Sequence, residues 1–355
     1  MVGIMSVFRK NRTVVVLIAL GLFSLAFFFL FPRPPADAVS RWGGRTMGTS
    51  YEVQLAGVTV PHGALGELKK KVDAELVALN EAMSTYMPGS EISRFNRSAA
   101  GLDVEVGERF RTVLSRAEEV SVDSGGAFDP TVGPLVDLWG FGAGEAVEGE
   151  PTEAEISERL ARTGMERVRL QGQVLSKARD GVELNLSAIA KGYAVDRVMG
   201  LLVEEGFAHI YVEIGGEVAC RGVNASGVPW RVGVQTPRDH AEAGAVKVVS
   251  LHNRALATSG DYRNFVDTEG GRRHHIIDPR TGRPAEHRLA SVSVLARDCM
   301  TADAAATALY VMGTKEGLAW VEARPELEAL FIDRVGEGFE IMATEGFNAA
   351  LVAVP

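Results

Sequence analysis

Two oxygen-bearing side chains, Asp303 and Thr307, lie four residues apart in an alanine-rich segment that ends at Gly313. Alanine favours a helix and glycine favours its end, so the sequence predicts a short helix here. Residues four apart share one helix face, so the carboxylate and the hydroxyl point the same way past a flat wall of alanines. A few hard oxygens, completed by water and a substrate phosphate, suit Mg²⁺. The alternative interpretation of this spacing is a solvated helix edge.

Lys191 is a second candidate for chemistry. It lies in the first turn of a predicted helix that follows a predicted strand over 182–186 and ends at Gly206. A strand, a short turn and a helix together aim free N–H groups at a phosphate. A lysine adds positive charge to this already positive helix end, which is unfavourable unless an anion binds. A surface lysine with an extended side chain is the equally weighted alternative.

Further candidates stand in loops. Tyr86 precedes a Pro-Gly turn, where an aromatic ring either covers the core or stacks on a flat ligand. The loop Ala127–Asp129 runs into a segment rich in proline and glycine, which indicates an ordered loop with exposed backbone groups. His274 and His275 have no further histidine or cysteine at ligand spacing, so we expect hydrogen bonding in a polar site rather than transition-metal binding.

The pattern of apolar residues predicts which elements must position these side chains. Amphipathic helices are expected over 65–79 and 110–120, and a third around Glu153–Ala161 begins with a Thr152–Glu155 capping box. Alternating residues predict strands over 46–55, 209–219 (interrupted by Gly215 and Gly216), 230–234, 246–250, 330–333 and 339–342. We therefore expect an α+β fold with antiparallel strands and helices packed around one cleft, with a division into two lobes near 142–150 as an open alternative.

Composition sets further limits. The 355 residues are 46% hydrophobic and 23% charged, which is ordinary for a globular protein. A net charge of −9 and the absence of a basic face with interleaved aromatics argue against a nucleic-acid partner. Cys220 and Cys299 are too few for a disulfide framework or a zinc site, although they could pair in an oxidising compartment.

The first residues predict export. Val14–Phe31 is an uncharged apolar run preceded by Arg9, Lys10 and Arg12. Its length and flanking charges favour a retained membrane anchor with the N-terminus in the cytoplasm, and a cleaved signal peptide is the second interpretation. No cysteine follows the run, which excludes a lipoprotein anchor. We expect a membrane segment over 1–31, a linker over 32–44 and a catalytic body over 45–355 on the extracytoplasmic (periplasmic) side of the inner membrane.

Taken together and in order, these segments resemble the ApbE family of Mg²⁺-dependent FAD:protein FMN transferases. The resemblance spans roughly residues 45 to 315 and is carried by Met47–Thr49, Met83–Tyr86, Ser93–Asn96, Phe128–Gly133, Ile189–Asp196, Gly215–Gly216, Ala257–Asn264, His275–Gly282 and the Asp303/Thr307 helix. Each motif alone is weak, but the ordered set is specific.

The resemblance implies roles for individual residues. It assigns FAD binding to Met47, Tyr86, Ala127, Phe128, Asp129, Asn185, Lys191 and Ile277. It assigns Mg²⁺ to Asp303, Thr307 and the main-chain carbonyl of Ala188. The family usually has Asp where this chain has Asn185, which keeps the shape and the acceptor but loses the charge. His275 is our candidate for the general base, and Asp303 is counted among the catalytic residues.

The implied reaction moves the FMN moiety of FAD to a Thr or Ser hydroxyl of an acceptor protein and releases AMP. Family acceptors are membrane redox subunits that contain Ser/Thr-Gly-Ala-Thr or a close variant. Two alternatives stay open at this point: a Mg²⁺-dependent FAD pyrophosphatase giving FMN and AMP, and a non-catalytic exported flavin-binding protein. The intact Asp303/Thr307 pair argues against the non-catalytic alternative.

Overall fold

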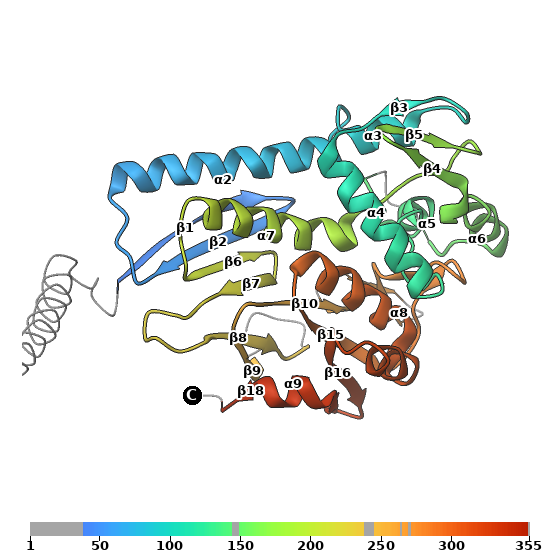
Figure 1. The fold of residues 1–355 in the computed structure, drawn as a ribbon. Coiled ribbons are helices and arrows are strands. Elements are labelled where there is room, and N and C mark those ends of the chain that lie inside the picture. The colour runs from blue at the N-terminus through green and yellow to red at the C-terminus, as the bar shows by residue number, and fades with distance from the viewer. Residues whose placement is uncertain (1–37, 144–148, 238–244, 263–264, 269–270, 354–355) are drawn as a thin grey trace, which may run out of the picture.

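The computed structural model describes residues 38–143, 149–237, 245–262, 265–268 and 271–353 (Figure 1). The apolar run Val14–Phe31, on which the predicted membrane anchor rests, lies outside these ranges. Within them, no helix combines the length and the apolar composition that crossing a bilayer requires.

An eight-stranded sheet forms the centre of the described body. Its order is β1-β2-β6-β7-β10-β15-β16-β17, and every neighbouring pair is antiparallel. The strands are β1 (Val39–Thr46), β2 (Thr49–Ala56), β6 (Ile210–Ile214), β7 (Glu217–Arg221), β10 (Arg254–Gly260), β15 (Leu289–Ala296), β16 (Glu328–Val335) and β17 (Gly338–Ala343). All eight residues of β15 are buried, because both faces of the sheet are covered. This sheet contains strands from both sides of the segment 142–150, the place of the possible division into two lobes, so the chain does not divide into two separate sheets there.

Four helices cover one face of the sheet (Figure 1). They are α2 (His62–Met83), α4 (Glu108–Asp123), α7 (Ser187–Glu204) and α8 (Cys299–Glu322). In α2 the buried residues Leu68, Val72, Leu76 and Leu79 recur at helical spacing and face the main core. The helices predicted over 65–79 and 110–120 are therefore confirmed.

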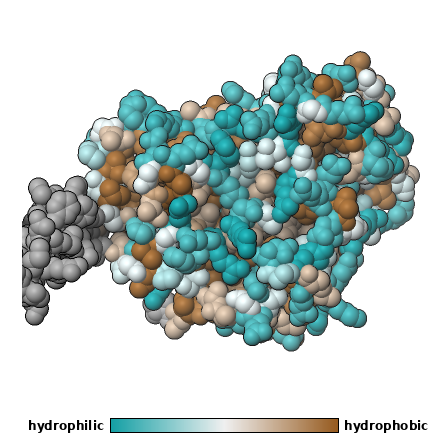
Figure 2. Space-filling model, in the orientation of Figure 1, coloured by the Kyte–Doolittle hydropathy of each residue, from teal (hydrophilic) through white to brown (hydrophobic). Residues whose placement is uncertain are grey.

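A smaller layer covers the opposite face. It contains the three-stranded sheet β18-β9-β8 (Leu351–Val352, Ala245–Leu251 and Trp230–Gln235) and the helix α9 (Glu345–Ala350). Trp230 and Phe347 pack there against Val218 and Leu330 of the large sheet. The surface in view in Figure 2 is largely hydrophilic, with apolar residues in small separate patches. The observed architecture is thus the predicted α+β class with antiparallel strands.

The segment between α2 and α7 builds a cap beside this core. It holds α3 (Glu91–Arg97), α5 (Gly133–Leu138), α6 (Glu153–Leu160), a 3₁₀ turn over Met165–Arg167, and a sheet ordered β3-β5-β4 (Val104–Glu105, Val174–Lys177 and Val168–Gln171). The predicted Thr152–Glu155 capping box is present. Two short hairpins, β11-β12 (Phe265–Thr268, Gly271–His274) and β13-β14 (Ile277–Asp278, Arg283–Pro284), complete the described elements.

Two boundaries near the start of the body differ from the prediction. The predicted linker over 32–44 overlaps β1, in which Ser40 and Trp42 are buried and the strand pairs with β2 along its whole length. The strand predicted over 46–55 begins at Thr49 instead. Met47 and Gly48 both have positive φ, at 48° and 72°, which makes a tight two-residue hairpin turn.

The strand predicted over 182–186 is not formed, although the segment is extended and its alternate residues are buried. Side chains and a loop satisfy its backbone instead of a neighbouring strand. Asn96 donates to the Leu184 carbonyl and accepts from the Leu184 N–H at 2.9 and 2.8 Å. Lys177 Nζ donates to the Val182 carbonyl at 2.9 Å. Periodicity cannot distinguish these two ways of pairing an extended backbone.

The helix predicted to end at Gly313 is interrupted there but continues. Gly313 has φ 71° and ψ 173°, and helical geometry resumes up to Glu322. A second helical segment therefore follows the part of α8 that carries Asp303 and Thr307. The strands predicted over 330–333 and 339–342 are confirmed as parts of β16 and β17.

Candidate active site

A cavity of about 350 Å³ lies where α7 and α8 meet the ends of β7 and β10 and the cap. This volume lies in the range of small-molecule sites. The cavity brings together eleven of the twelve predicted site residues, from segments far apart in the sequence: Tyr86, Ala127, Phe128, Asp129, Asn185, Ala188, Lys191, His275, Ile277, Asp303 and Thr307.

Met47 is the exception. It lies at the tip of the β1-β2 hairpin, is partly buried against the main core, and is not among the residues that line the cavity. The sequence placed Met47 in a strand, whereas its positive φ turns the chain at this point. The tip is nevertheless close to the cavity, because a Cβ on the lining residue Gly215 would meet Thr49 at 2.9 Å.

Asp303 is the centre of the cavity's polar wall. The residue is 3% exposed as part of a buried helix face. The Gly192 N–H donates to Asp303 Oδ2 at 2.9 Å, and Lys191 Nζ lies 3.7 Å from Asp303 Oδ1. In a regular α-helix the N–H of residue 192 points toward the carbonyl of Ala188. The Asp303 carboxylate and the Ala188 carbonyl therefore lie on the same side of α7.

Glu217 is a cavity residue that the sequence did not single out. It is the first residue of β7, is 3% exposed, and lies 2.8 Å from Lys191 Nζ. Lys191 is thus held between two buried carboxylates rather than extended over the surface. The one sequence signal for this residue was a glutamate directly after the Gly215-Gly216 turn. Strand alternation alone does not predict that its charge is buried.

Close packing of α7 on α8 creates this arrangement. A Cβ on Gly192 would lie 2.3 Å from the Cys299 carbonyl oxygen and 2.8 Å from Asp303 Cβ, so only glycine fits. Four residues further along α7, Asp196 accepts hydrogen bonds from the N–H groups of Cys299 and Met300, both at 2.8 Å. Burial, with smaller contributions from Asp298 and Asp303, raises the pKa of Asp196 to about 7.

The hydroxyl of Thr307 faces β10. Its Oγ1 lies 3.1 Å from Ser259 Oγ, and Thr258, Ser259 and Gly260 all line the cavity. Because Thr307 is one helical turn after Asp303, both oxygens reach the same cavity, as the spacing predicted.

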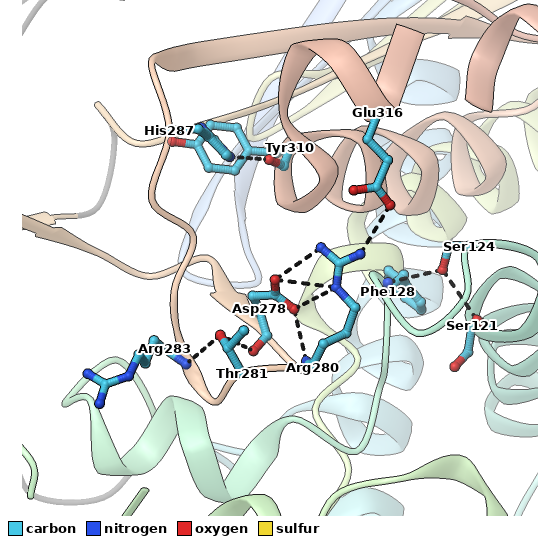
Figure 3. Close-up of polar contacts among 10 residues, drawn as sticks. All are labelled: Ser121, Ser124, Phe128, Asp278, Arg280, Thr281, Arg283, His287, Tyr310 and Glu316. Carbon is cyan, nitrogen blue, oxygen red and sulfur yellow. Dashed lines mark hydrogen bonds and ion pairs between the residues drawn. The ribbon is translucent and has the colours of Figure 1, made fainter. Parts of the chain in front are cut away.

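The loop 127–129 is ordered by short-range hydrogen bonds, as its composition predicted. The Phe128 N–H donates to Ser124 Oγ at 3.1 Å, which Figure 3 shows beside the end of α4. Asp129 Oδ1 accepts from the N–H and the hydroxyl of Thr131 at 2.7 and 2.6 Å. Burial raises the pKa of Asp129, and the Thr131 contacts partly oppose that change.

Asn185 connects this loop to the start of α7. Its N–H donates to the Pro130 carbonyl at 2.7 Å. Its Oδ1 accepts from the N–H and the hydroxyl of Ser187 at 3.0 and 2.6 Å. The two hydrogen bonds to Oδ1 need only an acceptor oxygen in the side chain, which Asn and Asp share.

The adjacent histidines have different roles in the structure. His274 is buried; its Nδ1 accepts from the Ile276 N–H and its Nε2 donates to the Ala285 carbonyl. Burial lowers the pKa of His274, so the neutral ring is favoured. His275 lines the cavity, and its ring meets Phe141 edge-on at a centroid distance of 6.4 Å. The predicted hydrogen-bonding role is thus confirmed for His274, and His275 lines the cavity.

A rigid turn holds the His275–Ile277 segment in place. Arg280 forms ion pairs with Asp278 at 3.0 Å and with Glu316 of α8 at 3.1 Å (Figure 3). The indole N–H of Trp139 donates to the Gly282 carbonyl at 2.8 Å. Ile277 packs with the apolar residues of α5 and α6. The turn therefore connects the cap to α8 across one side of the cavity.

The two cysteines are both buried and free in the structure. Burial raises the pKa of each thiol. Cys299 Sγ lies 3.7 Å from the Val218 carbonyl. The disulfide that the sequence allowed is therefore not formed.

The fold and the cavity define a class of protein: an α+β enzyme body with a cavity that combines a carboxylate, a hydroxyl, a lysine and aromatic rings. The ApbE family model matches residues 47–331. This chain belongs to the ApbE family.

Relatives agree with this assignment over nearly their whole length. A Vibrio cholerae protein named FAD:protein FMN transferase is 40% identical over 318 residues, which cover 89% of this chain and 94% of that protein. A Salmonella typhimurium protein of the same name is 37% identical over 314 residues, covering 87% and 89%.

Two solved structures are similar to this chain over a comparable share of its length. The flavin transferase ApbE from Vibrio cholerae superposes with a TM-score of 0.81 at 39% identity, covering 88% of this chain and 99% of that one. The Pseudomonas stutzeri flavinyl transferase ApbE, in its apo form, gives a TM-score of 0.80 at 37% identity, covering 90% and 98%.

Proposed function

We propose that this protein is a Mg²⁺-dependent FAD:protein FMN transferase, which moves FMN from FAD to a Thr or Ser hydroxyl of an acceptor protein and releases AMP. The observation that carries the proposal is the convergence of Asp303, Thr307, Lys191 and the Ala188 segment on one cavity. The names of the curated relatives support the same reaction.

The residues present fit Mg²⁺. Among the described residues, no group of three or more His, Cys, Asp or Glu side chains gathers to hold a metal. A cation at Asp303 would therefore take one carboxylate, the Thr307 hydroxyl and the Ala188 carbonyl, and complete its shell with water and FAD phosphate. A bound Mg²⁺ would neutralise negative charge that develops on the phosphate oxygens.

The protein's own residues would bind and orient the pyrophosphate of FAD. Lys191 is in reach of both Asp303 and Glu217, so its ammonium is fixed at the cavity wall and can pair with a phosphate oxygen. The acceptor hydroxyl oxygen attacks the phosphorus of the FMN half and forms a new P–O bond. The P–O bond of the pyrophosphate breaks, and AMP leaves with the electron pair.

The hydroxyl proton needs an acceptor. We propose His275, which lines the same cavity beside Phe141. The isoalloxazine would stack near Tyr86, whose side chain is 71% exposed at the cavity mouth. Water in place of the acceptor hydroxyl would give FMN and AMP, so hydrolysis is an outcome that the test must separate.

We further propose that the body works outside the cytoplasm, anchored by residues 14–31, on a membrane redox subunit with a Ser/Thr-Gly-Ala-Thr-like motif. The support is the apolar run and the basic residues before it. A reporter fused to the C-terminus should be active only if it is exported, and cytoplasmic reporter activity would contradict the proposal.

The central experiment incubates the full-length protein with FAD, Mg²⁺ and an acceptor carrying this motif. In-gel flavin fluorescence reports transfer, and free FMN with AMP reports hydrolysis. Asp303→Ala and Asp303→Asn should abolish transfer, because neither leaves a charged ligand. Thr307→Ala should be milder and partly rescued by excess Mg²⁺, since water can replace a neutral hydroxyl.

The matched control is Thr112→Ala, which removes a helical threonine from the exposed face of α4. Circular dichroism checks that each variant is folded. A wild-type transfer rate for Asp303→Ala in saturating FAD would refute the proposed role of this cavity. FMN and AMP without a fluorescent acceptor would favour the pyrophosphatase.

A further inference from the structure

A second hollow, of about 420 Å³, lies at the opposite ends of the strands that build the active-site cavity. Arg221 ends β7, Arg254 begins β10, and Arg297 follows β15, and all three line the hollow. We call it the arginine hollow. It shares no lining residue with the active-site cavity.

The three arginines have no acidic partners in the described part of the chain. None of them forms an ion pair there, whereas the neighbouring arginines Arg109 and Arg197 both pair with Glu75. Asp196 is the only carboxylate that lines the hollow, and both its oxygens accept N–H groups of α8. In a protein of net charge −9, this leaves a locally uncompensated basic site that favours an anion.

The hollow lies at the end of the body where the described chain begins. The Gly57 N–H donates to the Ala38 carbonyl at 2.9 Å, and the Ala56 N–H donates to the His209 carbonyl at 3.0 Å. His209 Nδ1 in turn accepts from the Val223 N–H at 3.2 Å, directly after the lining residue Gly222. In Figure 1 this is the left-hand side, where β1 begins and β7 ends.

The link between the apolar run and the described body is short. Only residues 32–37 separate the apolar run from the first described residue, and six residues reach at most about 20 Å. If residues 14–31 anchor the protein, this end of the body faces the bilayer. The active-site cavity lies at the N-terminal end of α7, around Ala188, which is on the order of 15 Å along the helix from Met199 of the hollow.

We propose that the arginine hollow binds the phosphate headgroups of anionic lipids in the membrane that holds the N-terminal segment. The inference rests on the proposed anchoring. Each arginine near an anionic surface contributes about fivefold to binding, so three contribute on the order of a hundredfold. Headgroup binding would hold the body upright, with the active-site cavity facing away from the bilayer toward the acceptor.

The test places the full-length protein in lipid nanodiscs that contain a phosphatidylglycerol with a photoactivatable headgroup. After illumination, mass spectrometry should find the label on peptides that contain Arg221, Arg254 or Arg297. A phosphatidylcholine probe should label them weakly. The Arg221→Gln, Arg254→Gln, Arg297→Gln triple variant should lose labelling by about a hundredfold, and each single variant by about fivefold.

The control triple, Arg111→Gln, Arg169→Gln and Arg288→Gln, removes the same charge from residues outside the hollow and should keep full labelling. Equal labelling by phosphatidylcholine, or unchanged labelling of the hollow variants, would overturn the proposal. So would loss of labelling in millimolar AMP or inorganic phosphate at constant ionic strength, which would indicate a site for soluble phosphates.

FMN transfer measured in the same nanodiscs separates the two proposals. Normal transfer without headgroup labelling rejects lipid binding alone, whereas labelling without transfer rejects the proposed activity alone. Recovery of the wild-type protein in the soluble fraction, outside any membrane, rejects the anchoring and the lipid site together.

Discussion

Gly192→Ala tests whether the close approach of α7 to α8 creates the active site. The added methyl group would lie 2.3 Å from the Cys299 carbonyl oxygen, where an ordinary contact begins at 3.4 Å. The two helices must therefore separate by about 1 Å, since both contacts involve rigid parts of α8. The Gly192 N–H to Asp303 Oδ2 hydrogen bond, now 2.9 Å, would lengthen beyond hydrogen-bonding distance.

The expected effect on stability is moderate and the expected effect on activity is large. Overpacking of this kind costs about 1–3 kcal/mol of unfolding free energy. A displacement of about 1 Å between groups that act together costs about a hundredfold in rate. Lys191 moves with α7 and Asp303 with α8, so the substitution changes their separation directly.

Gly200→Ala is the matched control, because Gly200 lies in the same helix and a Cβ there meets nothing within 4 Å. This control should gain about 0.5–1 kcal/mol from helix propensity and keep full activity. Urea unfolding measures stability, and acceptor fluorescence measures transfer at several Mg²⁺ concentrations. Full transfer by a folded Gly192→Ala variant would refute the reasoning that this contact sets the geometry of the site.

Two further outcomes are expected. Tyr86→Ala should weaken FAD binding several-fold without unfolding the protein, since stacking contributes roughly 0.5–1.5 kcal/mol beyond area burial; fluorescence titration with an unchanged Kd would remove Tyr86 from the site. The pKa of Asp196 is raised to about 7 in the folded state, so the folded protein holds this proton more tightly than the unfolded chain does. The free energy of unfolding should therefore be higher at low pH and fall as pH rises from about 4 through 7, by at most about 1.4 kcal/mol per pH unit. Urea unfolding should show this slope in the wild type and lose it in Asp196→Asn; identical pH profiles would contradict it.

Local spacing was sufficient to predict much of the candidate site. The Asp303–Thr307 pair shares a helix face because the i to i+4 relation depends only on helix geometry. The glycine and proline content of the 127–134 loop likewise predicted local order, which the structure confirms through Ser124 and Thr131. The ordered family motifs added the assignments of Asn185, Ile277 and Ala188 to the same site, where all three line the cavity.

Other features depended on residues that the sequence does not bring together. The 182–186 segment has the alternation of a strand, but Asn96 and Lys177 satisfy its backbone from elsewhere in the fold. Met47 belongs to the family motif, yet its turn geometry keeps it out of the cavity lining. Glu217 had no motif of its own and became a site residue only when β7 was placed beside Lys191.

The sequence by itself therefore determined many of the elements and the α+β class, because these follow from short-range periodicity and residue type. The ordered motifs added the family resemblance and most of the chemical groups of the site. Only the tertiary structure decided how the groups meet. The hydrogen bond from Gly192 to Asp303 joins residues 111 positions apart, and it exists because a glycine lets two helices approach more closely than any side chain allows. Such a distance is set by packing between elements, which local spacing does not encode.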